Sequence, residues 1–459
     1  MGNSETNDKR RSLMLEASPY KAIPILAAPL ILSMLIDSVY NMTDAYFVSS
    51  LGQTVVAAVG VNDALLAYMR AIAMCFATGA ASVLSRLLGA KREKEADTVA
   101  STTLFTAIGI LTLAAAIAYI FVGSLITLLG ATPTVKPYSV TYARIVLLSA
   151  PFVAMEVVTN FLLRSEGNTR MSMIGTSSGC IANMILDPVF ILPWGLNLGI
   201  AGAALATVIG RVISCSILIS PYIRKKAMLH ISIRNFRAKW TVYKEVIKMG
   251  IPSTIRDALM TGSWVVMNNV AGGFGDAALA AITVSKKTIN LVASAVMGFG
   301  QGYQPLAGFC WGAKKYKRVR ETFKACTLLG WAAAIVLGAV LTIFSRNLAL
   351  LFAEENETEV VRIASLMIAS QSITLIPHIW GVVINGLCQA VGRPIYSTLV
   401  GLSRNFICLI PLIFIMTGLF GVEGLALSQA AANILSLAIC IPIIISCLKK
   451  CKEAEKENA

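Results

Sequence analysis

The residues best suited to chemistry are polar groups inside long apolar segments. Asp44 ends the stretch "MLIDSVYNMTD", and Asp187 lies in "NMILDPVFI". An ionisable group at bilayer depth is costly unless it is paired or hydrated, so each carboxylate is a functional candidate. With the amide of Asn183 and the hydroxyl of Thr207, these carboxylates offer oxygen atoms that can surround a small hard cation. In a dry pocket the same groups can hold a proton instead.

A third carboxylate shares a helix face with Asp44. Asp37, Asn41 and Asp44 are spaced i, i+4 and i+7, which places them on one side of a helix. The rise across these seven residues is about 10 Å, so Asp37 lies deeper than Asp44. Arg70 of the following apolar segment has a matching depth. The pattern therefore predicts an Asp37–Arg70 ion pair, with Asn41 and Asp44 belonging to an outer site. The alternative is that Arg70 faces the water of a cavity on its own.

The elements that carry these groups are apolar runs of membrane-spanning length. The chain has 459 residues, of which 56% are hydrophobic and 14% charged, and its mean hydropathy is +0.73. Runs of about 20 apolar residues recur, and each can cross a bilayer as a helix. The sequence predicts an all-α polytopic membrane protein with twelve transmembrane helices. The predicted spans are 23–48, 55–86, 99–129, 138–163, 171–193, 200–222, 245–271, 278–311, 322–345, 360–388, 395–417 and 422–448.

The formal net charge of +15 is explained by topology rather than by a nucleic-acid partner. Lys and Arg gather in the loops after the even-numbered spans, as in "GAKREKEAD" and "GAKKYKRVRE", whereas the opposite loops are poor in both. Cytoplasmic loops of membrane proteins are enriched in Lys and Arg. We therefore expect a multi-pass protein of the plasma (inner) membrane with both termini in the cytoplasm.

An internal repeat predicts the domain organisation. Pro252 follows Pro29 by 223 residues, and Gly312 follows Gly89 by the same 223. Spans 1–6 and 7–12 are thus two copies of one six-helix unit, in parallel orientation, around a central cavity. The predicted parts are an N-terminal tail (1–22), an N-lobe (23–222), a linker (223–244), a C-lobe (245–448) and a C-terminal tail (449–459).

Two such lobes are typical of an alternating-access transporter. The sequence contains no phosphate-binding P-loop, which predicts transport driven by an ion gradient or passive facilitation. It also contains no spaced His/Glu metal set or nucleophile motif in the spans. We therefore expect no enzyme activity, no cofactor and no metal beyond a possible Na⁺.

The ordered motifs resemble those of the multidrug and toxic compound extrusion (MATE) family. They are "YNMTDAYFVSSLG", "GAAS…LLGAKR", "RSEGNTRMS", "NMILDPVFI", "GIAGAALAT" and "QAVGRP". The resemblance implies two lobes around a V-shaped cavity, and export of drugs or organic cations against H⁺ or Na⁺. It places the coupling site at Asp44, Asn183, Asp187 and Thr207, and matches Pro29 to a proline implicated in bending the first span.

The sequence departs from the family at two places. Asp37 occupies a position that is commonly small or uncharged. Met260 stands where some members place a glutamate, so a cation site in the C-lobe is doubtful. Asp257 lies one turn earlier, and one of the adjacent lysines Lys286 and Lys287 is expected to pair with it.

Further candidates form two groups. A possible charge network within the membrane comprises Asp37, Arg70, Glu156, Arg211, Asp257 and Lys286. Candidates for contact with a flat amphipathic substrate are Tyr40, Asn41, Tyr68, Met69, Trp264, Met267, Phe299 and His378. The alternative role for the aromatic and Met residues, in place of substrate contact, is packing in the protein interior or contact with lipid.

The sequence leaves two functions open. One is a monomeric antiporter that exports amphipathic, mostly cationic small molecules in exchange for H⁺ or Na⁺. The other is a flippase or exporter of a lipid-linked, anionic or zwitterionic metabolite, which the intramembrane Lys and Arg residues favour. The motifs around Asp44 and Asp187 favour the antiporter.

Overall fold

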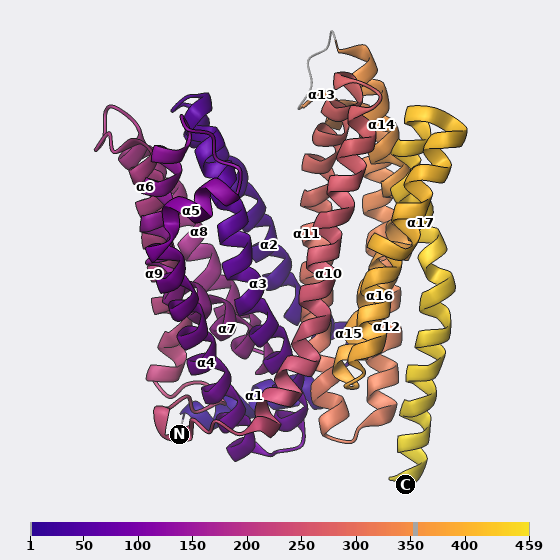
Figure 1. Cartoon of the computed structure of the whole chain (residues 1–459). Coiled ribbons are helices and arrows are strands. Elements are labelled where there is room, and N and C mark those ends of the chain that lie inside the picture. Colours follow the sequence, from indigo (N-terminus) through magenta and orange to yellow (C-terminus); the bar gives the residue numbers. More distant parts are fainter. Residues whose placement is uncertain (1, 352–356, 459) are drawn as a thin grey trace. The chain divides into compact units, whose positions relative to one another are not determined.

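The computed structural model describes residues 2–351 and 357–458, and every regular element within those ranges is a helix. The first half contains α1 (Gly2–Leu15), α2 (Pro19–Ser49), α3 (Gln53–Gly89), α4 (Glu93–Ile120), α5 (Val122–Leu128), α6 (Lys136–Leu147), α7 (Ala150–Ser165), α8 (Thr169–Ile191) and α9 (Gly199–Ile223) (Figure 1). The second half contains the 3₁₀ helix η1 (Ile233–Asn235), α10 (Trp240–Gly272), α11 (Asp276–Gly312), α12 (Tyr316–Ile343), α13 (Ser345–Leu350), α14 (Thr358–Ile373), α15 (Leu375–Ala390), α16 (Pro394–Leu402), the π-helix η2 (Ser403–Cys408) and α17 (Leu409–Glu457).

The predicted all-α membrane fold is confirmed. Eight helices of the described ranges are long and apolar enough to cross a membrane, and ten spans result when the bent pairs α6–α7 and α14–α15 each count once. The 33-residue α10 is about 50 Å long and can supply another. The remaining one arises because α17 is broken at Gly421, where φ 58° and ψ −136° interrupt the helix. This accounting agrees with the twelve predicted spans.

The chain divides into two compact units. Unit 1 comprises residues 1–13 and 32–250, and unit 2 comprises residues 14–31 and 251–459. Two helices are therefore divided between the units: α2 divides after Ile31, and α10 divides after Gly250. These divisions differ from the predicted lobe boundaries at 222 and 245, which followed loops rather than packing.

Glycines explain why the divided helices pack this way. In unit 2, a Cβ atom on Gly302 of α11 would lie 2.7 Å from the Cα atom of Ala27 on α2. In unit 1, a Cβ atom on Gly79 of α3 would lie 2.0 Å from the carbonyl oxygen of Val246 on α10. Gly79 and Gly302 are equivalent in the 223-residue repeat. Small residues let two backbones approach closely, so both copies use the same contact.

The repeat also extends to the apolar cores. In unit 1 a buried cluster gathers side chains of α2, α3, α6, α8 and α9, and its counterpart in unit 2 gathers side chains of α10, α11, α14 and α17. Three positions correspond at an offset of 223: Val48, Val55 and Ala58 of unit 1 match Ala271, Ala278 and Ala281 of unit 2.

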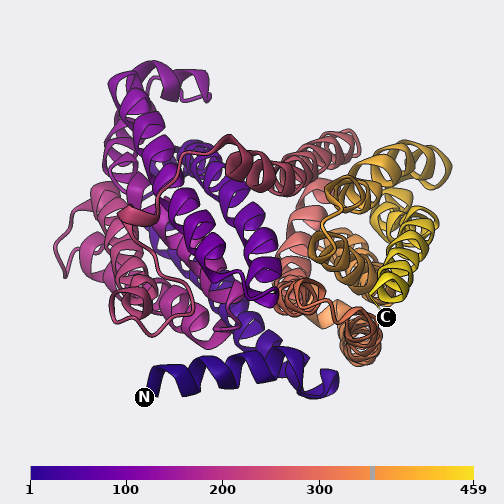
Figure 2. The ribbon, with the colours of Figure 1, turned by 90° about the horizontal axis from the view of Figure 1, so that it is seen from below.

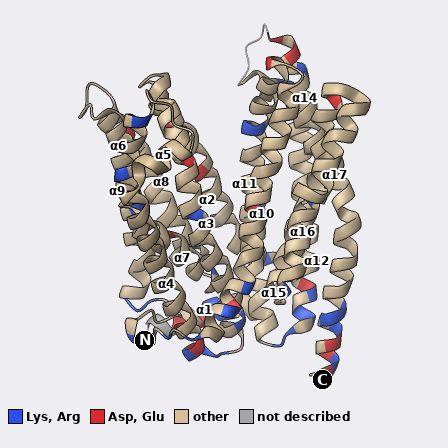
Figure 3. Ribbon diagram, in the orientation of Figure 1, with Lys and Arg blue, Asp and Glu red and all other residues tan. Residues whose placement is uncertain are grey.

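The predicted tails are largely helical. Residues 2–15 form α1, which runs crosswise to the spanning helices of unit 1 (Figure 2), and α17 continues to Glu457. Arg11 on α1 forms an ion pair with Glu93 at the start of α4 at 2.5 Å. Charged residues gather towards the helix ends of each unit and are sparse along the middle of the helices (Figure 3).

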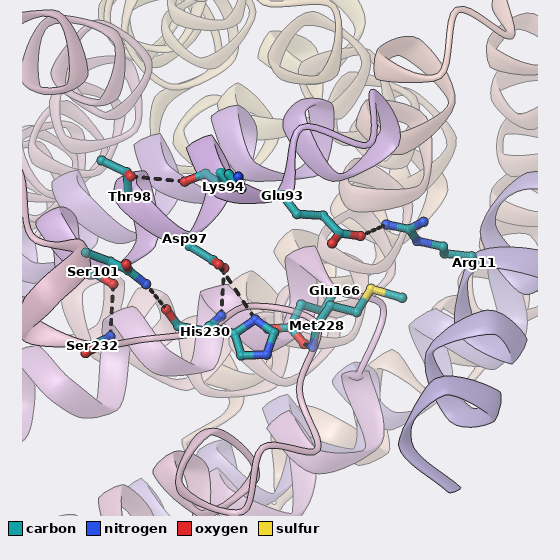
Figure 4. Close-up of polar contacts among 11 residues, drawn as sticks. Arg11, Glu93, Lys94, Asp97, Thr98, Ser101, Glu166, Met228, His230 and Ser232 are labelled. Carbon is teal, nitrogen blue, oxygen red and sulfur yellow. Dashed lines mark hydrogen bonds and ion pairs between the residues drawn. The ribbon is translucent and has the colours of Figure 1, made fainter. Parts of the chain in front are cut away.

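The segment after α9 is held to unit 1 by hydrogen bonds from its backbone amides to side chains of that unit. The amide of Met228 donates to Glu166 Oε2 at 2.7 Å, and the amide of His230 donates to Asp97 Oδ1 at 2.7 Å (Figure 4). The amide of Ser232 donates to the Ser101 hydroxyl at 3.2 Å. The linker is therefore an ordered segment that packs across one end of unit 1.

Candidate ion-coupling site

Unit 1 brings the four predicted coupling residues together. Asp44 comes from α2, Asn183 and Asp187 from successive turns of α8, and Thr207 from α9. The Asn183 amide donates to the Thr207 hydroxyl at 3.5 Å, and that hydroxyl donates to the carbonyl of Ala203 at 3.0 Å. The carboxyl groups of Asp44 and Asp187 lie close enough to interact. Three helices thus contribute side chains to one polar cluster.

Asp187 has an unusual environment. Its side chain is 0% exposed, and neither carboxylate oxygen accepts a hydrogen bond from any residue in 2–351 or 357–458. The Oδ1 atom of Asn183 is likewise buried without a donor. Buried polar atoms in proteins are nearly always satisfied. Two neighbouring carboxyl groups and an unpaired amide oxygen therefore form a group of polar atoms to which a proton or a small cation can bind.

Close packing of α8 against α9 positions Asn183 and Thr207. A Cβ atom on Gly179 would lie 2.7 Å from the carbonyl oxygen of Gly210, and one on Gly210 would lie 2.8 Å from the carbonyl oxygen of Gly179. Gly179 is one turn from Asn183, and Gly210 is three residues from Thr207. The two glycines allow the backbones to meet beside the polar residues.

An apolar cluster closes one side of the site. Val48 lies four residues after Asp44, and Ile191 lies four residues after Asp187, so each is one turn along on the same face. Both side chains belong to the buried cluster of unit 1. This arrangement shields the carboxyl groups from water on that side.

Two residues near the site were missed by the sequence analysis. Asp63 on α3 lies close enough to Asp44 for an electrostatic interaction, and the buried Tyr142 on α6 approaches Thr207. Asp63 lies in the apolar stretch "GVNDALLAYMR". The rule that flagged Asp44, a carboxylate inside a span, would have identified Asp63 as well. Tyr142 carries no signal in the sequence alone.

The predicted Asp37–Arg70 ion pair is wrong. The nitrogen atoms of Arg70 lie beyond 4.0 Å from the Asp37 carboxylate, which instead contacts the Asn41 amide at 3.5 Å and the Cys180 thiol at 3.9 Å. Both charged groups lie near enough to Cys180 to interact with it electrostatically. Asp37 faces α8, whereas the Arg70 side chain is exposed.

Another pair of the proposed network does form. Arg211 on α9 donates to Glu156 on α7 at 3.4 Å, and Ser214 donates to the other Glu156 oxygen at 2.9 Å. The two charged side chains are 15% and 16% exposed. Charged side chains that are nearly buried are expected to form an ion pair with additional hydrogen bonds, as the Ser214 hydroxyl provides here.

Asp257 has a partner that the sequence did not predict. Asp257 pairs with its neighbour Arg256, whose Nη2 atom lies 2.9 Å from the carboxylate. Lys286 instead places its ammonium 4.9 Å from the ring centroid of Trp264, a cation–π contact. Arg256 is the residue next to Asp257 in the chain, so its guanidinium can reach the carboxylate without any contribution from another helix.

The substrate-contact candidates divide by burial. Met69 is 4% exposed and Met267 is 0% exposed, so both are packing residues rather than contacts. Tyr68 is 66% exposed on unit 1, and Tyr40 lies beside Asp44. Asn41 donates to the carbonyl of Asp37 at 2.6 Å, which occupies its amide.

The remaining candidates lie in unit 2. Phe299 on α11 packs near Gly330 of α12. His378 on α15 interacts electrostatically with Arg404 of η2. Pro29 lies within α2, two residues before that helix divides between the units.

Comparison with known proteins identifies the family. The sequence profile of the MatE family matches residues 29–189 and 252–415, one segment in each copy of the repeat. A curated relative is the multidrug export protein MepA of Staphylococcus haemolyticus, 26% identical over 432 residues that cover 94% of each chain. The MepA protein of Staphylococcus aureus is 26% identical over 421 residues, covering 91% of this chain and 92% of the relative.

Solved structures share the fold. An outward-facing multidrug resistance MATE family transporter of the MOP superfamily superposes with a TM-score of 0.89 at 22% identity, covering 96% of this chain and 98% of the other. MATE in complex with MaL6 gives a TM-score of 0.90 at 22% identity, with 98% and 99% coverage.

Within the described ranges no group of three or more His, Cys, Asp or Glu side chains is arranged to hold a metal ion.

Proposed function

From the premise that this chain belongs to the MATE family, we propose that it is a cation-coupled antiporter that exports amphipathic organic compounds. The observation that carries the proposal is the buried Asp187 carboxylate, which lacks a donor and lies beside Asp44. A group that must be completed by a proton or a cation is suited to take up the coupling ion. Related proteins are named as multidrug exporters, which supports the transport direction.

In this proposal the coupling ion, H⁺ or Na⁺, binds between Asp44 and Asp187, with the oxygen atoms of Asn183 and Thr207 nearby. Binding removes the repulsion between the two carboxylates, so α2 and α8 are drawn together. Pro29, which cannot donate a backbone hydrogen bond within α2, gives that helix a place to bend. The ion then favours one conformation of unit 1 over another, and this difference drives substrate release.

The orientation follows from charge. The loops of unit 1 that contain Lys91, Arg92, Arg224, Lys225 and Lys226 are basic, which supports a cytoplasmic location for that end. We propose a monomer in the plasma membrane with both termini cytoplasmic. Its substrates are small amphipathic molecules, most of them cationic, and it performs transport rather than catalysis.

Efflux from cells that lack their own exporters tests the proposal. Asp44→Asn and Asp187→Asn should each abolish export of a fluorescent organic cation. Asp276→Asn, a matched change at the exposed start of α11, should leave export intact. If both site variants export like the parent, the site is assigned wrongly. Varying Na⁺ at fixed pH, and then collapsing the pH gradient, identifies the coupling ion.

A further inference from the structure

One end of unit 2 carries an open depression lined by charged side chains. Its volume is about 470 Å³, and it lies where the turn after α11, the start of α12 and the end of α17 meet. Its charged lining residues are Lys314, Lys315, Lys317, Arg318, Glu321 and Glu455. Glu455 is neutralised by Arg320, whose Nη2 atom lies 2.5 Å from the carboxylate. Basic side chains are therefore in excess in this depression.

The hydrogen-bond partners of these basic side chains are neutral. Lys314 donates to the side-chain oxygen of Asn458 at 3.3 Å. Lys315 and Arg318 donate to three backbone carbonyls within residues 14–17, at distances of 2.5–3.2 Å. Such oxygen atoms hold the side chains in place but do not cancel their charge. The depression therefore still attracts an anion.

The other copy of the repeat lacks this excess of positive charge. At the 223-residue offset, Arg318 corresponds to Glu95 and Arg320 corresponds to Asp97. In unit 1 both carboxylates have partners, since Glu95 pairs with Arg92 at 2.6 Å and Asp97 accepts an amide of the linker. The excess is thus specific to unit 2. The general enrichment of cytoplasmic loops in Lys and Arg does not explain it, because that rule applies equally to both copies.

Aromatic side chains indicate that the depression lies at the level of lipid headgroups. Tyr316 belongs to the lining, and its ring meets that of Trp311 edge to face, with centroids 4.9 Å apart. Lys450 of α17 places its ammonium 5.4 Å from the Trp311 centroid, and Figure 3 shows further basic residues at the same end of α17. Trp and Tyr are enriched where membrane meets water. Basic pockets between spanning helices at this level suit lipid phosphates.

We propose that this depression binds the headgroup of an anionic phospholipid. Lys314 and Lys317, both exposed, donate to the phosphate oxygens, and the other cations of the lining add to the attraction. A lipid fits better than a soluble phosphate because Trp311 and Tyr316 lie beside the cations, where they can contact the apolar part of the molecule. This inference goes beyond transport, since it involves neither the exported substrate nor the coupling ion.

Photo-cross-linking of the full-length protein tests the proposal. The protein is placed in phosphatidylcholine nanodiscs with a trace of phosphatidylglycerol that carries a diazirine on its headgroup. The label should appear on residues 311–321, and unlabelled phosphatidylglycerol should displace it, whereas millimolar inorganic phosphate should not. Each lysine beside an anionic lipid contributes about fivefold in affinity. Lys314→Gln combined with Lys317→Gln should therefore reduce labelling of this segment about 25-fold.

The matched control is Lys91→Gln with Lys94→Gln, exposed lysines at the equivalent positions of unit 1, which should leave this labelling unchanged. Lys314→Arg with Lys317→Arg preserves the charge and should preserve most of the labelling.

The proposal is overturned if residues 311–321 of the parent take up no label, or if the Gln variant of unit 2 labels like the parent. An equal loss in the unit 1 control would show a general effect of charge and would also overturn it. Displacement by inorganic phosphate would identify a soluble anion as the ligand, and the assignment to lipid would then be wrong.

Discussion

Glu166 allows a quantitative test of how the linker is attached. It lies between α7 and α8, outside the spans, is 0% exposed and accepts the Met228 amide at 2.7 Å. Burial raises the pKa of this carboxyl from 4.5 to about 7, and the hydrogen bond from Met228 offsets this only in part. The folded state thus holds a proton that the exposed carboxyl would release.

The sign of the effect follows from proton binding. Between pH 4.5 and 7 the attached form binds more protons than the detached form, so attachment weakens as pH rises through this window. Each pKa unit is worth about 1.4 kcal/mol, which gives a loss of about 3 kcal/mol across the window. This corresponds to about a hundredfold increase in the population of the detached linker.

Hydrogen exchange measures this loss directly. After correction for intrinsic rates, the Met228 amide should lose about two decades of protection between pH 5 and 8. The Ser232 amide, which donates to the Ser101 hydroxyl, lies in the same linker and should lose protection in parallel if the linker detaches as one unit. Glu166→Gln keeps an acceptor oxygen but cannot ionise, so its Met228 protection should be independent of pH. Equal pH dependence in the parent and in this variant would refute the reasoning.

Two further substitutions test packing and charge in unit 1. Gly210→Val should force α8 from α9 and lower stability by about 1–3 kcal/mol with loss of transport, whereas Gly109→Val, with no atom within 4 Å of its Cβ position, should be tolerated. Equal thermal unfolding midpoints in detergent would contradict the close contact. Glu156→Gln should destabilise the protein by about 3 kcal/mol because Arg211 loses its partner, and Glu156→Gln with Arg211→Met should recover part of this. No recovery in the double variant would show that the two residues act separately.

Hydropathy and the internal repeat predict the spans well because both are properties of the order of residues along the chain and need no knowledge of tertiary contacts. They predict the depth of a residue, but the rotation of a helix about its axis depends on its neighbours. Asp44 and Asp187 were predicted at similar depth and lie together. Asp37 and Arg70 were also predicted at equal depth, yet they point in different directions. The division of α2 and α10 between the units was not predictable, because it depends on side-chain contacts over more than 200 residues.

That division has a consequence for synthesis. Residues 14–31 of unit 2 are made first, but the rest of that unit begins only at Ile251, which is 220 residues after Ile31. At a translation rate of 5–20 residues per second, this segment waits roughly 10–40 s for its partners. During this time Ala27 has no glycine of α11 to pack against. The first apolar segment is thus a candidate client for chaperones in the membrane, and a ribosome stalled before residue 251 should leave it accessible to a cross-linker.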